Sequence, residues 1–191
     1  LSLIFVSGIN LIIFILFFIL IMFFLFCLIF FVPKFSYILL RFKSFFDLSS
    51  GSNYQSEKAS EAIISGGFFG KGIGEGILKN RVPEAHTDYI VSVISEEFGA
   101  LIIIFLMLVF LFFVYQIIKK LYSEKNNKIK LILVGSISIL LLQTLIHIGV
   151  NIRLFPTTGM TLPFLSYGGS SIVGTSILSG IILNLTKRRV S

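Results

Sequence analysis

The chain alternates long uncharged apolar stretches with segments that carry its charges. The uncharged stretches cover residues 1–33, 98–118, 131–152 and 154–186. A hydrocarbon core about 30 Å thick needs roughly 20 helical residues at about 1.5 Å each, so each stretch can hold one crossing. The pattern predicts an all-α integral membrane protein with four transmembrane helices, within residues 1–33, 91–118, 131–152 and 170–186. Prolines and glycines break residues 153–169, which we expect to form a re-entrant loop.

Composition and charge support this interpretation. Of the 191 residues 55% are hydrophobic and 13% are charged, which excludes disorder and argues against a soluble globular domain. The net charge of +7 comes from Lys and Arg spread over short connecting segments, and no basic domain suggests nucleic acid as a partner. Lys-rich residues 119–130 and the tail 187–191 are expected in the cytoplasm, and residues 34–90 and 153–169 on the periplasmic side.

The segment 34–90 is longer than a connection between two spans requires, so we expect functional residues there. It contains six glycines within residues 66–76. Neither a Walker A nor a GxGxxG spacing fits this run, so a tight loop packed on the membrane surface is favoured over a nucleotide loop. Within it, Lys71 is a candidate partner for a lipid diphosphate.

Carboxylates gather between the glycine run and the second span. Glu84, His86 and Asp88 are crowded together, and Glu96 and Glu97 follow on the same predicted helix. A carboxylate near hydrocarbon is costly unless it faces a cavity or a partner, which makes Asp88 a functional candidate. For Glu96 and Glu97 an ion pair between helices is an equally good explanation.

Polar residues also recur in the third span. Gln143, His147 and Asn151 are spaced four apart and therefore share one helix face. Since no third type of ligand accompanies His147, we expect this stripe to tie helices together by hydrogen bonds rather than to bind a metal.

Two long motifs resemble one known family. Residues 53–88 include Asn-Tyr-Gln, Gly-Gly-Phe-Phe-Gly-Lys-Gly and Pro-Glu-Ala-His-Thr-Asp, and residues 156–171 read Pro-Thr-Thr-Gly-Met-Thr-Leu-Pro-Phe-Leu-Ser-Tyr-Gly-Gly-Ser-Ser. Together they resemble the SEDS family of cell-wall proteins, in detail its division members more than its elongation members. The resemblance covers essentially the whole chain from residue 33 onward.

The resemblance implies a ten-helix membrane protein of which this chain is the last four helices. It implies a peptidoglycan glycosyltransferase that polymerises lipid II into glycan strands in the bacterial inner membrane, at the division septum. The partners implied are a class B penicillin-binding transpeptidase and other division proteins. The family's essential carboxylate corresponds to Asp88, which would act as the base that takes the proton of the attacking hydroxyl.

Further site residues follow from this chemistry. Cations or hydroxyls would bind the substrate and its departing diphosphate, and our candidates are Lys71, Arg81, Glu84, His86, Arg153, Thr157, Ser166, Tyr167 and Ser170. We expect no metal ligands from the chain and no fixed cofactor, with Mg²⁺ or Mn²⁺ left open.

Two departures keep other functions open. The family usually has Lys where this chain has Thr158, so one expected cation is absent and Arg153 is its candidate substitute. The chain opens with Leu1 inside an apolar stretch, so we expect an upstream part of a larger protein. A lipid II flippase, a non-catalytic division scaffold and an inactive fragment are the alternatives to an enzyme.

Overall fold

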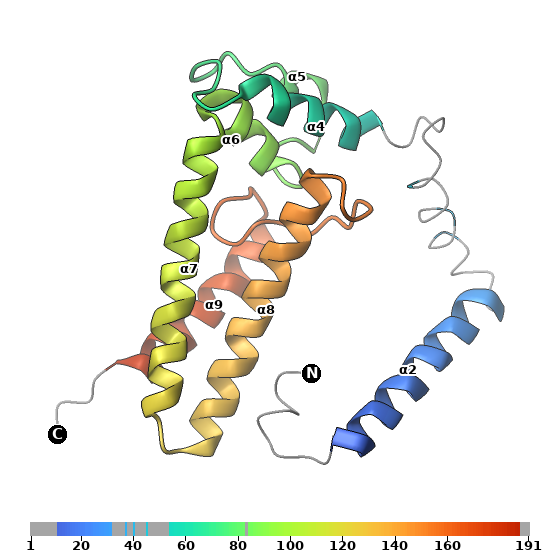
Figure 1. Ribbon diagram of the computed structural model, residues 1–191, viewed down its shortest axis with the longest axis vertical. Coiled ribbons are helices and arrows are strands. Elements are labelled where there is room, and N and C mark those ends of the chain that lie inside the picture. Colours follow the sequence, from blue (N-terminus) through green and yellow to red (C-terminus); the bar gives the residue numbers. More distant parts are fainter. Residues whose placement is uncertain are drawn as a thin grey trace. The chain divides into compact units, whose positions relative to one another are not determined.

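A computed structural model describes residues 11–31, 37, 40, 45, 54–82 and 84–187. Every regular element in this part of the chain is helical. Helices α2 (Leu11–Phe31), α7 (Ala100–Ser123), α8 (Asn127–Asn151) and α9 (Gly169–Thr186) contain the four segments long and apolar enough to cross a membrane. The predicted all-α class with four span helices is therefore confirmed (Figure 1).

The chain divides into two units, residues 1–53 and 54–191. In the first unit α2 is apolar at every position, and its described side chains are mostly exposed. A helix that is hydrophobic all round suits a membrane span, because lipid can cover every face.

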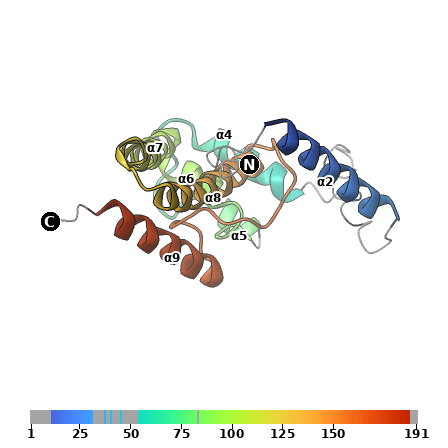
Figure 2. The same cartoon turned by 90° about the horizontal axis from the view of Figure 1, so that it is seen from below.

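In the second unit the long helices α7, α8 and α9 pack on one another, and α9 crosses α7 and α8 obliquely (Figures 1 and 2). Their shared core consists of buried aliphatic side chains: Val114, Ile117, Leu133, Ile137, Leu140 and Ile182. Outside this core the helices expose large apolar residues, as membrane helices do toward lipid.

Three short helices lie at one end of these spans: α4 (Tyr54–Gly66), α5 (Leu78–Arg81) and α6 (Ile90–Phe98). Small and aliphatic side chains from all three surround Tyr89, which is fully buried, and Val150 joins them from the end of α8. This second core attaches the segment with the candidate carboxylates to the membrane helices.

The continuous helix expected over residues 91–118 is two helices, α6 and α7, separated at Gly99. Gly99 has φ 83°, and a Cβ there would lie 2.2 Å from the Phe68 carbonyl oxygen. The Phe68 carbonyl of the glycine loop, residues 66–76, thus occupies the space that a side chain at position 99 would need. Composition alone did not reveal the break, because the residues on both sides are good helix formers.

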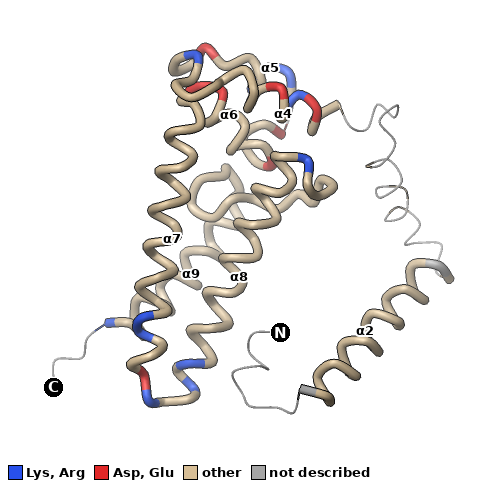
Figure 3. Tube along the Cα trace, in the orientation of Figure 1, with Lys and Arg blue, Asp and Glu red and all other residues tan. Residues whose placement is uncertain are grey.

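Charge is distributed unequally along the second unit. Lys and Arg gather at the connection between α7 and α8, whereas both signs mix around α4, α5 and α6 (Figure 3). This is the asymmetry on which the predicted orientation rests. Most of the expected loop before Tyr54, Pro83 and the tail 188–191 lie outside the described residues, and the predicted membrane borders stay predictions.

Candidate functional site

Asp88 lies in the turn that leads into α6, and it is partly buried. Three consecutive backbone carbonyls of this turn accept hydrogen bonds from other parts of the chain, and these bonds hold the turn in place. The His86 oxygen accepts from Tyr167 N at 3.1 Å, and the Thr87 oxygen accepts from Ser166 Oγ at 2.8 Å. The Asp88 oxygen accepts from the side-chain amide of Asn151 at 2.9 Å. Both motifs of the sequence therefore meet at the candidate carboxylate.

Asn151 is the main link between α8 and the Asp88 turn. It is fully buried, and its Oδ1 accepts from Ser92 N at 3.1 Å and from Ser92 Oγ at 2.7 Å. Its amide also donates to the His147 carbonyl at 2.8 Å. Both N–H groups and the oxygen of its side-chain amide are thus hydrogen-bonded inside the protein.

The rest of the polar stripe holds the loop of residues 153–169. Gln143 Nε2 donates to the Thr161 carbonyl at 2.9 Å, and His147 Nδ1 lies 2.7 Å from the Met160 carbonyl. Because a carbonyl can only accept, Nδ1 carries the proton in this contact. The prediction that the stripe ties elements together by hydrogen bonds is confirmed.

A glycine leaves open space beside the carboxylate. Gly159 has φ 69°, and a Cβ at this position would lie 3.9 Å from Asp88 Oδ2. Gly159 also lines a cavity of about 450 Å³ between α8, α9 and the loop, whose walls include Gln143, Thr161 and Ser170. The cavity offers hydroxyl and amide groups, and Gly159 is the lining residue that lies next to Asp88, which does not line the cavity itself. Sequence reasoning did not single out Gly159.

Several predicted substrate residues belong to this region. Ser166 is buried and accepts from Leu162 N at 2.8 Å, so its role is to hold the loop. Tyr167 and Ser170 are exposed, and Thr157 is half-buried in the same loop. On the opposing turn His86 and Glu84 are exposed, and Glu84 Oε2 accepts from Thr87 Oγ1 at 2.7 Å.

The predicted cations Lys71, Arg81 and Arg153 are not among the residues that line the cavity at Gly159. Lys71 and Arg81 line a second cavity, of about 140 Å³, and Asp88 is not among its lining residues. Lys71 Nζ is 2.9 Å from Glu96 Oε1, and Arg153 is 3.8 Å from Glu57 Oε1, a partner that the sequence did not suggest.

Glu96 and Glu97 both form ion pairs, which was one of the two explanations left open. Glu96 pairs with Lys71, and Glu97 Oε1 lies 2.9 Å from Lys79 Nζ. Burial acts to raise the pKa of Glu96, but the Leu78 N–H at 3.0 Å and the Lys71 ammonium outweigh it. The pKa of Glu96 is therefore below its ordinary value, and the group is a fixed carboxylate that anchors the glycine loop.

Tyr89, next to Asp88, is also perturbed. Burial, and then the negative charge of Asp88, raise its pKa to about 12. Within the described residues its hydroxyl has no hydrogen-bond partner. Nor do His, Cys, Asp and Glu gather in groups of three that could hold a metal ion, in the parts of the chain described above.

Comparison with known proteins gives this arrangement a family. The model of the cell cycle protein family FtsW/RodA/SpoVE matches residues 1–190. The chain belongs to this family. The SEDS resemblance predicted from the two motifs is thereby confirmed.

Curated FtsW/RodA/SpoVE relatives are similar over most of the chain. A probable peptidoglycan glycosyltransferase FtsW from Caulobacter vibrioides is 37% identical over 81% of this chain and 40% of its own length. The Enterococcus hirae protein of the same description is 42% identical over 73% of this chain and 36% of its own length. The chain thus spans about two fifths of the length of these relatives.

One solved structure shares the fold. It is described as "Structural coordination of polymerization and crosslinking by a peptidoglycan synthase complex", and it matches 97% of this chain and 51% of its own with a TM-score of 0.60. At 24% identity the match shows a shared fold alone.

Proposed function

We propose that this chain supplies the catalytic carboxylate of a peptidoglycan glycosyltransferase that polymerises lipid II. The observation that carries the proposal is the position of Asp88. It lies where two family motifs meet, next to Gly159, which lines the cavity of about 450 Å³. The names of the curated relatives support the reaction class.

In this mechanism Asp88 acts as general base. The 4-hydroxyl of one sugar attacks the anomeric carbon of the donor and passes its proton to the Asp88 carboxylate. The bond from that carbon to the lipid diphosphate breaks with inversion, and the diphosphate leaves with the bonding electrons. A base within hydrogen-bond reach typically contributes about 10²–10⁴-fold to such a step.

The leaving diphosphate needs positive charge, and we propose Arg153 for this role. Its ion pair with Glu57 is long, at 3.8 Å, and Glu57 is half exposed. Exchanging such a pair for a diphosphate costs little, because exposed ion pairs contribute only about 0–1 kcal/mol. Lys71 would have to give up a shorter contact with the buried Glu96.

Cations, partners and location complete the proposal. Because the described residues offer no cluster suited to a metal, we derive no step through Mg²⁺ or Mn²⁺. The solved peptidoglycan synthase complex that shares the fold motivates a class B penicillin-binding transpeptidase as partner. The resemblance to the division members of the family motivates the inner membrane at the division septum as the place of action.

The test is lipid II polymerisation in vesicles, with the chain supplemented by the part of the family fold that it does not span and by a transpeptidase partner. Asp88→Asn should lower the polymerisation rate at least about 100-fold. Glu75→Gln, which removes an exposed carboxylate of the same segment, should leave it unchanged.

Equal polymer from Asp88→Asn and the unaltered chain would refute Asp88 as the base. Movement of lipid II across the vesicle membrane without polymer would favour a flippase. If division partners bind equally well to both proteins and neither makes polymer, a non-catalytic scaffold is favoured over an enzyme.

A further inference from the structure

The glycine loop between α4 and α5 carries three apolar side chains that touch little of the protein. Phe68, Phe69 and Ile73 are 70%, 84% and 80% exposed. We refer to these three residues as the apolar tip. Contiguous apolar groups left this open in a native protein mark a surface that something else covers.

Backbone groups on both sides of the tip are hydrogen-bonded to α6 and α7. Gly67 O and Phe68 O accept from Ala100 N at 2.8 Å and Leu101 N at 3.4 Å, the first N–H groups of α7. On the other side of the tip, Lys71 N and Gly72 N donate to the last carbonyls of α6, those of Glu96 and Glu97, at 2.9 and 3.1 Å. These bonds attach the loop to the start of the span helix α7 and to the end of α6.

The loop cannot fold back to bury its tip. Gly70 packs so closely on α6 that a Cβ there would lie 2.2 Å from the Glu97 carbonyl oxygen. The Lys71–Glu96 and Lys79–Glu97 ion pairs fasten both sides of the loop to the same helix. The tip is therefore held outward.

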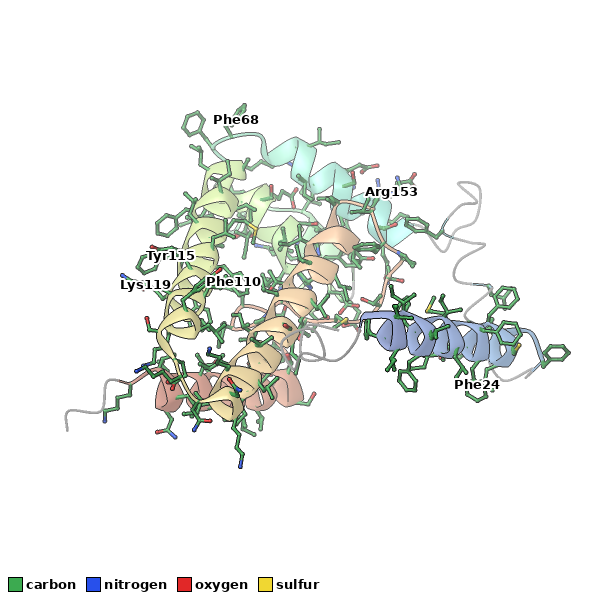
Figure 4. The ribbon with its side chains drawn as sticks, turned by 60° about the horizontal axis from the view of Figure 1, so that its bottom comes forward. Phe24, Phe68, Phe110, Tyr115, Lys119 and Arg153 are labelled. Carbon is green, nitrogen blue, oxygen red and sulfur yellow. The ribbon has the colours of Figure 1, made fainter. Side chains whose placement is uncertain are left out.

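The length of α7 places the tip at the edge of the bilayer. Residues 100–118 rise about 28 Å at about 1.5 Å each, which matches a hydrocarbon core about 30 Å thick. Lys119 and Lys120 then mark one boundary, and Ala100, to which the loop is bonded, marks the other. Figure 4 shows Phe68 pointing outward from the loop and Lys119 far along α7.

The apolar surface continues from the tip along the span. Leu101, Ile104 and Phe105 lie on one face of the first turns of α7 and are 50%, 52% and 58% exposed. Since lipid covers this face of a span helix, the same bilayer extends to the loop bonded to it.

We propose that Phe68, Phe69 and Ile73 insert into the bilayer at the boundary between headgroups and acyl chains. They form an interfacial anchor that holds α6, and with it the Asp88 turn, at a fixed height above the hydrocarbon. The occupant is lipid rather than a partner protein, because the tip is hydrogen-bonded to the first turn of a span whose exposed face is apolar. The anchor does not depend on glycosyltransferase activity.

The absence of tryptophan from the 191-residue chain allows a direct test. Phe69→Trp creates a single fluorophore at the tip, and Asn80→Trp creates the matched control on the exposed side of α5. Each variant is reconstituted into phosphatidylcholine bilayers with and without bromine near the carbonyl end of the acyl chains. Emission is measured with and without iodide, and circular dichroism confirms equal helix content.

Bromolipid should quench the emission of Phe69→Trp at least about twofold, since interfacial segments insert about 5–10 Å, while iodide should have little effect on it. The Asn80→Trp control should show the reverse. Quenching of the tip fluorophore by iodide and not by bromolipid would overturn the proposal. If a transpeptidase partner then removed the quenching by iodide, the tip would bind a protein and not lipid, which would also overturn it. If Phe69→Trp loses helix content, Ile73→Trp tests the same tip with the same outcomes.

Discussion

Asn151 makes the strongest prediction about stability, because one buried side chain connects three parts of the fold. In Asn151→Ala, Ser92 loses the acceptor for both its N–H and its hydroxyl. The carbonyls of Asp88 and His147 lose a donor. The side chain is fully buried, so water does not readily replace it at these groups.

The magnitude follows from these four bonds. A net contribution of about 1 kcal/mol per hydrogen bond gives a loss of about 4 kcal/mol. Using the average of about 0.6 kcal/mol found between membrane helices gives about 2.4 kcal/mol. For a protein of this size, each kcal/mol corresponds to roughly 2–4 °C in melting temperature, so the expected fall is about 5–15 °C.

The assay is thermal unfolding of the purified chain in bilayers, followed by loss of helical circular dichroism. Asn184→Ala is the matched control, because Asn184 is exposed on α9, and it should change stability by less than about 0.5 kcal/mol. Asn151→Asp keeps the acceptor for Ser92 but places a buried carboxylate oxygen against the carbonyls of Asp88 and His147, so it should lower stability at least as much as Asn151→Ala. Equal melting temperatures for Asn151→Ala and Asn184→Ala would refute the role of Asn151 as the link.

Three further changes test the surroundings of the site by the same melting assay. Gly70→Ala puts a Cβ 2.2 Å from a backbone oxygen and should lower the free energy of unfolding by about 2–4 kcal/mol. Gly67→Ala, where a Cβ would meet open space, should lower it only by the backbone strain of about 1–2 kcal/mol. Equal losses for the two variants would contradict the close approach of Gly70 to α6. Because the pKa of Glu96 is lowered in the folded state, its ionised form stabilises the fold above about pH 4.3, and this stabilisation is lost as the pH falls through the folded pKa. Glu96→Gln should therefore weaken the fall of melting temperature at acidic pH. An unchanged fall would show that the ion pair contributes nothing. Tyr89→Phe removes a buried hydroxyl without a described partner and should leave stability equal or raise it by up to about 1 kcal/mol, so a fall of several degrees would reveal a missed partner.

The membrane fold could be predicted from the sequence because span length and loss of charge are properties of single segments. Each of the four predicted crossings overlaps one of the observed span helices, although α7 ends five residues later than predicted and α8 begins four residues earlier. The separation of α6 from α7 was not predictable in the same way, since Gly99 alone does not end a helix. The Phe68 carbonyl that occupies its space comes from a loop 31 positions earlier in the chain.

The candidate site shows the same division between local and long-range information. Asp88 and the stripe that includes Asn151 were identified from spacing and from the cost of polar groups near lipid. Their direct bond joins positions 63 apart, and only the fold brings them together. For the same reason the carboxylate partners of Lys71 and Arg153 were not predicted, because Glu96 and Glu57 lie far from them in the sequence.

The way in which the Asp88 turn is held makes the proposed chemistry separable from structure. The three bonds from Tyr167, Ser166 and Asn151 all end on backbone carbonyls, so none of them requires the carboxylate of Asp88. Asp88→Asn therefore keeps these contacts and removes a base, which an isosteric amide cannot replace. A loss of polymerisation with unchanged melting temperature would assign the chemistry to this one side chain. A fall in both quantities would instead make the carboxylate part of the support of the turn, and the catalytic proposal would lose its main argument.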